Sequence, residues 1–100
     1  MKLLIVEDDD KLRKELAKFF SGHGYETEEV TDYENLEDAV WKAGGDLLLL
    51  DIGLPVTDGM FLCRGLRKRS TLPIVIITSQ NTEMNELLCM NYGADDFIAK

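Results

Sequence analysis

Cysteine and histidine are scarce in this sequence, which has two cysteines and one histidine in 100 residues. Cys63 and Cys89 show neither CxxC nor Cys/His spacing, so the sequence does not indicate a zinc site or a disulfide framework. We interpret both as reduced packing cysteines, which fit a cytoplasmic protein. His23 lies between two glycines in SGHGY without a ligand-spaced partner, and we interpret it as a solvated turn residue.

Positive charge is also in short supply, because 11 Lys and Arg residues compare with 19 Asp and Glu, giving a formal net charge of −8. A surface this acidic repels the phosphate backbone, so we do not expect this segment to bind DNA directly. No apolar run approaches the length needed to cross a membrane, and no membrane partner is expected. Neither GxxxxGK[ST] nor GxGxxG occurs, so nucleotide binding is not expected either.

What the sequence does contain is a regular alternation of short apolar runs and amphipathic segments. We expect strands at residues 3–6, 25–30, 46–50, 74–78 and from 96 onward, and helices at residues 10–21, 32–43, 58–68 and 82–91. Asp32 and Asp58 are expected to cap the second and third helices, and Phe61, Leu62 and Leu66 to face inward. Because helical crossovers of this length join parallel strands, the fold class is α/β, a doubly wound sheet with helices on both faces.

Chemically active side chains follow the ends of several expected strands. They are Glu7 and Asp8, Asp51, Thr78 and Ser79, and Lys100. Because the carboxyl ends of parallel strands share one edge of a sheet, we expect these side chains to converge. Clustered carboxylates repel one another, and Mg²⁺ prefers oxygen ligands of this kind. The run EDDD at residues 7–10 also has a plainer interpretation, an acidic helix amino terminus that the helix dipole favours.

This combination of residues suits phosphoryl transfer to a carboxylate. Asp51 can act as a nucleophile that carries an aspartyl phosphate. Mg²⁺ and Lys100 would neutralise charge on the transferring group, and Thr78 can donate a hydrogen bond to a phosphoryl oxygen.

Four segments, distributed along nearly the whole chain, resemble the receiver domain of bacterial two-component response regulators. They are most similar to the subgroup whose receivers precede a winged-helix DNA-binding domain. They are IVEDD, LLLLDIGLPVTDG, IVIITS and GADDFIAK. The resemblance implies a five-stranded parallel sheet of order 2-1-3-4-5. It also implies a role for each matching residue: Asp51 as phosphoacceptor, Glu7 and Asp8 as the acidic pair that binds Mg²⁺, Gly53 as a carbonyl donor to the metal, Thr78 and Phe97 as switch residues, and Lys100 as the phosphate-pairing lysine.

The function implied by the resemblance is a phosphorylation-activated signalling switch. The domain would catalyse only its own phosphorylation and dephosphorylation, so it is not expected to be an enzyme with an external substrate. A sensor histidine kinase is the implied phosphoryl donor, and phosphorylation is expected to promote a homodimer. The intact parent protein would control transcription, binding DNA through an output domain.

The resemblance also sets an expectation for the end of the chain. Members of the family continue beyond the position of Lys100 with a fifth helix. We therefore expect residues 1–100 to form one receiver domain, truncated before that helix and without the output domain. One face of the sheet near the first and fifth strands would then be exposed.

Two alternatives remain open at this point. A metal-dependent phosphohydrolase also forms an aspartyl phosphate, but such enzymes usually carry a second aspartate two residues after the nucleophile, where this sequence has Gly53. A pseudo-receiver that only mediates protein contacts is expected to lack an acidic, acceptor or lysine residue. Glu7, Asp8, Asp51 and Lys100 are all present.

Overall fold

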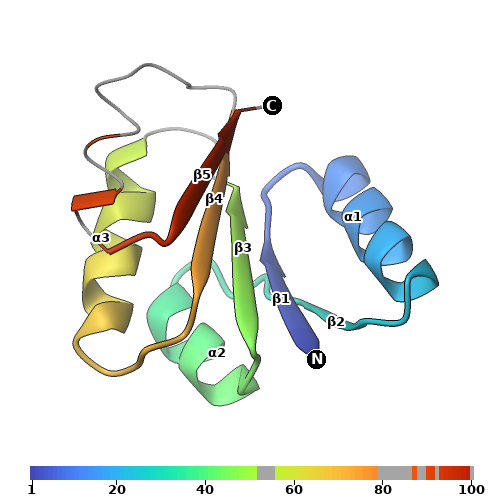
Figure 1. The fold of residues 1–100 in the computed structure, drawn as a ribbon, viewed down its shortest axis with the longest axis horizontal. Helices are drawn as coiled ribbons and strands as arrows, with labels where there is room; N and C mark the ends of the chain where they lie inside the picture. The colour runs from blue at the N-terminus through green and yellow to red at the C-terminus, as the bar shows by residue number, and fades with distance from the viewer. Residues whose placement is uncertain (52–55, 79–86, 88–89, 92, 100) are drawn as a thin grey trace.

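The computed structural model describes residues 1–51, 56–78, 87, 90, 91 and 93–99; at residues 51, 56–60, 78 and 97–99 it describes the backbone alone. Strands and helices alternate along these residues, as the sequence predicts (Figure 1). The elements are β1 Lys2–Val6, α1 Asp10–Gly22, β2 Glu26–Glu29, α2 Leu36–Ala43, β3 Leu47–Asp51, α3 Val56–Arg67, β4 Ile74–Thr78 and β5 Asp96–Ala99. The expected helix at 82–91 falls mostly outside the described residues, although 87, 90 and 91 are helical.

All strand pairs of the sheet are parallel, and the strand order is β2-β1-β3-β4-β5. This confirms both the predicted fold class and the order implied by the resemblance. β2 lies at one edge of the sheet, as its polar sequence ETEE suggests. The order reverses between β1 and β3, because the chain runs from β1 to β2 on one side and later returns to β3 on the other.

Helices lie on both sides of the sheet, with α1 on one side and α2 and α3 on the other (Figure 1). The larger core lies between the sheet and the α2–α3 layer, where alternate residues of β1, β3 and β4 meet Val40 of α2 and Leu66 of α3. Its buried members are Leu4, Val6, Val30, Val40, Leu48, Leu50, Leu62, Cys63, Leu66, Ile74, Ile76 and Ala94. Cys63 is fully buried, as its interpretation as a packing cysteine requires.

The opposite face of the sheet is covered less evenly. Helix α1 contacts β1 and β2, and Ile5 on this face is fully buried. Leu47, Val75 and Ile77, which share the face by strand alternation, are only half-buried. Leu49 on the same face of β3 is buried, so the covering layer is thinner over β4 and the start of β3 than over β1. Among the described residues, no helix is long and apolar enough to span a membrane.

Both predicted helix caps are wrong. Helix α2 begins at Leu36 after Asn35, and the carbonyl of Asp32 instead accepts a hydrogen bond from the Asn35 amide at 3.1 Å, which closes a turn before the helix. Helix α3 begins at Val56, so Asp58 lies inside the helix. In both segments an aspartate able to cap was present, but it does not stand at the position where the helix starts.

The inward orientation predicted for Phe61 is also wrong. Its side chain is 65% exposed, whereas Leu62 and Leu66 are buried as expected. Successive helical residues are rotated by about 100°. The buried stripe of α3 is carried by Leu62, Cys63 and Leu66, and Phe61 is turned out of it.

Arg69, just after α3, connects this helix to α2. Its Nη1 donates to Glu37 Oε2 at 3.0 Å and to Asp38 Oδ1 at 2.8 Å. The guanidinium carbon lies 4.8 Å from the ring centroid of Trp41, which is cation–π distance. The hydrogen bond from Arg69, together with its positive charge, lowers the pKa of Asp38 from its ordinary value.

This ion pair predicts a pH dependence. A carboxyl group whose folded pKa is depressed contributes stability that is present above its unfolded pKa and is lost as the pH falls through the folded value. We expect Arg69→Gln to raise the titration midpoint of the Asp38 carboxyl, measured by NMR. Lys11→Gln, on a distant helix, serves as the control and should leave that midpoint unchanged. Equal midpoints in Arg69→Gln and the wild type would contradict the assignment.

Gly45, between α2 and β3, is expected to tolerate no side chain. A Cβ built there lies 2.5 Å from Cγ of the fully buried Leu4, whereas one at Gly22 meets nothing within 4 Å. We expect Gly45→Ala to lower the free energy of unfolding by about 1–3 kcal/mol, because overpacking must displace core side chains. Gly22→Ala, the matched control in α1, should leave stability unchanged or raise it by up to about 1 kcal/mol. Urea unfolding measures both, and similar effects would refute the packing argument.

Candidate functional site

The ends of three adjacent strands bring the predicted site residues to one edge of the sheet. Val6 pairs with Leu50, so the next residue of each chain segment, Glu7 and Asp51, follows at the same edge. Asp51 in turn pairs with Ile77, which Thr78 follows. This edge lies at the carboxyl ends of β1 and β3, where the strand order reverses, and that is where ligands bind in open α/β sheets.

The remaining predicted site residues differ in how far the structure describes them. Thr78 pairs with Ala99, the last residue of β5, so β5 also ends at this edge. Phe97 lies within β5. For Asp51, Thr78 and Phe97 the structure describes the backbone but not the side chain. Gly53 and Lys100 lie outside the described residues. The predicted roles of these residues therefore remain predictions.

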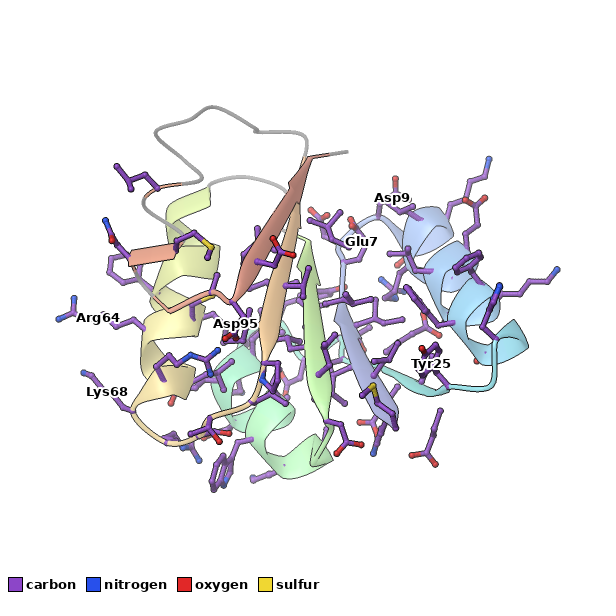
Figure 2. The ribbon with its side chains drawn as sticks, in the orientation of Figure 1. Glu7, Asp9, Tyr25, Arg64, Lys68 and Asp95 are labelled. Atoms are coloured by element: carbon purple, nitrogen blue, oxygen red, sulfur yellow. The ribbon has the colours of Figure 1, made fainter. Side chains whose placement is uncertain are left out.

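Glu7 and Asp8 occupy the turn between β1 and α1, and their environments differ. Glu7 is 1% exposed, and its Oε1 accepts a hydrogen bond from the Asp9 amide at 3.0 Å. The labels in Figure 2 show Glu7 and Asp9 together at the end of the sheet, beside the start of α1. Asp8 is exposed. Within the described part of the chain, no hydrogen bond or ion pair is formed by the Asp8 carboxylate.

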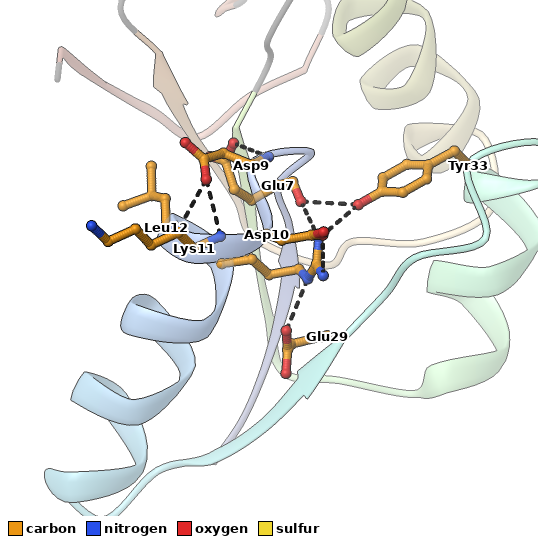
Figure 3. Close-up of polar contacts among 8 residues, drawn as sticks. Glu7, Asp9, Asp10, Lys11, Leu12, Glu29 and Tyr33 are labelled. Carbon is orange, nitrogen blue, oxygen red and sulfur yellow. Dashed lines mark hydrogen bonds and ion pairs between the residues drawn. The ribbon is translucent and has the colours of Figure 1, made fainter.

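Asp9 and Asp10 serve the helix. Asp9 is the N-cap of α1, and its Oδ1 accepts from the amides of Lys11 and Leu12 at 3.0 and 3.2 Å (Figure 3). Asp10 lies in the first turn, and its Oδ1 is 2.6 Å from Nη2 of Arg13. The interpretation of EDDD as an acidic helix terminus therefore describes its last two residues, and Glu7 and Asp8 remain as the candidate cation ligands.

Arg13 is a residue that the sequence did not identify. The spacing of apolar residues in α1 predicts that its lysines and arginines face solvent, yet Arg13 is 7% exposed. Its Nε donates to Glu29 Oε1 at 2.8 Å, and its Nη1 donates to the carbonyl oxygen of Glu7 at 2.9 Å (Figure 3). Hydrogen bonds to Asp10 and then to Glu29 raise the pKa of Arg13. The only sequence feature that pointed to Arg13 was its position three residues after Asp10, and such pairs are common on exposed helix faces.

The donor set fits a hard divalent cation. Among the described side chains, no group of three His, Cys, Asp or Glu residues is arranged to hold a metal. Glu7 and Asp8 nevertheless supply carboxylates from adjacent positions at the edge where Asp51 ends β3. Mg²⁺ needs only one or two carboxylates, because water and phosphate oxygens complete its coordination. Oxygen donors without histidine or thiolate favour Mg²⁺ over softer metals.

Comparison with known proteins identifies the family. Residues 3–100 match the model of the response regulator receiver domain. The chain belongs to this family. The resemblance seen in the sequence is thereby confirmed, and the domain is the phosphorylation-activated switch of two-component systems, a signalling module rather than a classical enzyme.

Relatives of the receiver domain include bacterial regulators and solved structures. The transcriptional regulatory protein YxdJ of Bacillus subtilis is 36% identical in sequence, and the alignment covers 99% of this chain and 43% of YxdJ. The sensory transduction protein RegX3 of Mycobacterium tuberculosis is also 36% identical, and the alignment covers 98% of this chain and 43% of RegX3. The crystal structure of the BeF3-activated N-terminal receiver domain of Klebsiella pneumoniae RstA is 37% identical with a TM-score of 0.90, and the alignment covers 100% of this chain and 86% of that one. The chain thus spans less than half of the length of the curated relatives it matches.

Because Asp9 caps α1 and Asp8 is a candidate cation ligand, replacing each of these exposed aspartates should have a different effect on stability and on Mg²⁺ binding. We expect Asp9→Ala to lower the free energy of unfolding in EDTA by about 1 kcal/mol, because two helix amides lose their acceptor. Asp8→Ala should stay within about 0.5 kcal/mol of the wild type. Added Mg²⁺ should raise the Tm of the wild type and of Asp9→Ala but not of Asp8→Ala, because of these two aspartates only Asp8 is a candidate ligand. Equal losses in EDTA, or an undiminished response of Asp8→Ala to Mg²⁺, would contradict this division.

Proposed function

We propose that this receiver domain accepts a phosphoryl group on Asp51 from the phosphohistidine of a sensor histidine kinase. The observation that carries the proposal is the parallel pairing of β3 with both β1 and β4. It brings Glu7, Asp51 and Thr78 to one sheet edge from three separate strands. The family match over residues 3–100 supports the same chemistry.

In the proposed reaction a carboxylate oxygen of Asp51 attacks the phosphorus atom of the phosphohistidine. The new O–P bond forms as the P–N bond breaks, and the histidine nitrogen leaves with the electron pair and takes up a proton. Hydrolysis of the acyl phosphate by water later restores the Asp51 carboxylate and releases inorganic phosphate. The domain thereby catalyses only its own modification and its reversal.

Glu7, Asp8, Asp51 and the carbonyl of Gly53 would hold Mg²⁺ in this proposal. When bound, the cation supplies compensation for the negative charge of the phosphoryl oxygens. Lys100 would pair with the phosphoryl group, and the Thr78 hydroxyl would donate to one of its oxygens. The new charge at Asp51 would bias two conformations of the domain that differ at Thr78 and Phe97. These two residues belong to the neighbouring strands β4 and β5.

We also propose that the domain belongs to a longer cytoplasmic regulator that controls transcription. Phosphorylation would promote a homodimer, and DNA would be bound by an output domain outside this chain. The relatives YxdJ and RegX3, more than twice as long as the matched region, support this arrangement.

The phosphoacceptor is tested with acetyl phosphate and Mg²⁺, followed by intact-protein mass spectrometry. We expect the wild type to gain one phosphoryl group and Asp51→Asn to gain none, because the amide is not a nucleophile under these conditions. Asp46→Asn is the control, since Asp46 precedes the same strand at its amino end and accepts a hydrogen bond from the Lys2 amide at 2.8 Å. It should be phosphorylated like the wild type.

The alternatives are separated by this assay together with a kinase reaction and a steady-state phosphatase assay. Labelling that persists in Asp51→Asn would refute the proposed acceptor. A wild-type protein that takes no label from acetyl phosphate or from a kinase would favour a pseudo-receiver that mediates protein contacts. Steady release of phosphate from many small phosphoesters would favour the phosphohydrolase.

A further inference from the structure

Glu7 and Arg13 are the buried charged residues in the described part of the chain, and they belong to one cluster. A guanidinium removed from water costs free energy unless it is paired and its N–H groups are used. Arg13 meets this requirement: Asp10 and Glu29 lie within ion-pair distance at 2.6 and 2.8 Å. Two carboxylates thus balance the charge, and the Nη1 group is left to bond neutral oxygens.

That Nη1 group takes part in a closed triangle of hydrogen bonds. It donates to the carbonyl oxygen of Glu7 at 2.9 Å and to the hydroxyl oxygen of Tyr33 at 3.1 Å. The Tyr33 hydroxyl donates to the same Glu7 carbonyl at 2.9 Å (Figure 3). A single backbone oxygen therefore accepts two hydrogen bonds, from α1 and from the segment after β2.

The position of this oxygen connects the cluster to the candidate site. The carbonyl of Glu7 and the amide of Asp8 form one planar peptide unit. Fixing the oxygen therefore orients the bond that joins the two candidate cation ligands, at the point where β1 has ended and sheet pairing no longer fixes the backbone. Mg²⁺ demands near-ideal octahedral geometry, so its affinity depends on how well such ligands are oriented.

We propose that Arg13 and Tyr33 are positioning residues that clamp the Glu7–Asp8 peptide for cation binding. The inference rests on the proposed function in one respect, namely that Glu7 and Asp8 bind Mg²⁺. Neither residue touches the cation in this proposal. Both act through the Glu7 carbonyl.

Arg67 provides a matched control at the opposite edge of the sheet. Its guanidinium also bonds two backbone carbonyls, those of Gly93 and Leu72, and pairs with Asp95. Asp95 immediately precedes β5, so this cluster lies near the amino ends of the strands. Replacing Arg67 should disturb folding as replacing Arg13 does, without reaching the Glu7–Asp8 peptide.

The test measures the Kd for Mg²⁺ from amide chemical shifts in NMR titrations of the wild type, Arg13→Lys, Tyr33→Phe and Arg67→Lys, with urea unfolding of each protein in EDTA. We expect about a tenfold or larger increase in Kd for Arg13→Lys, the range typical of lost partners of metal ligands. A smaller increase, of about threefold, is expected for Tyr33→Phe, which loses one of two donors. Arg67→Lys should lose stability and keep the wild-type Kd. Tyr33→Phe retains the ring of a side chain that is 46% exposed, so it keeps the test valid if Arg13→Lys fails to fold.

The outcomes separate the inference from the function on which it rests. A wild-type Kd in Tyr33→Phe, or a Kd raised equally in Arg67→Lys, would overturn the positioning role while leaving the cation site intact. Absence of Mg²⁺ binding by the wild type would overturn the proposed cation site and the inference with it. Phosphorylation of Asp51 by acetyl phosphate, measured on the same wild-type sample, then reports whether the acceptor proposal survives.

Discussion

The pairing register between β1 and β3 is the constraint on which the rest of the structure depends. Leu4 pairs with Leu48 and Val6 with Leu50, and all four side chains are buried in the core against α2 and α3. A slip of one residue would turn these side chains to the other face of the sheet, so burial holds the register. The same register sets Glu7 beside the end of β3. Hydrophobic burial therefore brings the carboxylates to one edge despite their mutual repulsion.

The cost of that repulsion is reduced by giving each acid a different environment. Asp9 accepts from helix amides and Asp10 pairs with Arg13, so both charges are compensated within α1. Glu7 is buried but accepts the Asp9 amide. Asp8 keeps its solvent shell. The four consecutive acids therefore do not form a single site, and negative charge that calls for a cation is concentrated at the first two, next to Asp51.

The sequence predicted the strands, the sheet class and the edge at which the candidate site residues lie, because continuous apolar runs such as LLIV and IVIIT are typical of buried parallel strands. It predicted the start of α1 at Asp10 but not the starts of α2 and α3. Asp32 and Asp58 are residues of a type that caps helices, but α2 begins at Leu36 and α3 at Val56, so neither aspartate directly precedes a helix. It also could not predict the burial of Arg13, because Glu7, Glu29 and Tyr33 contact this side chain from the turn after β1, from β2 and from the segment after β2. Only the folded topology brings them together.

Arg13 and Arg67 illustrate why chemically similar clusters differ in consequence. A guanidinium is a planar fork that can bond two carbonyls and a carboxylate at once, which the ammonium group of lysine cannot do with the same geometry. At the amino ends of the strands, near Asp95, such a cluster connects α3 to the segments that precede β4 and β5. At the carboxyl ends, near Glu7, the peptide held by Arg13 joins the two residues that we propose as cation ligands. In this proposal, the position of an arginine relative to the strand ends decides whether its hydrogen bonds serve stability alone or also the function of the fold.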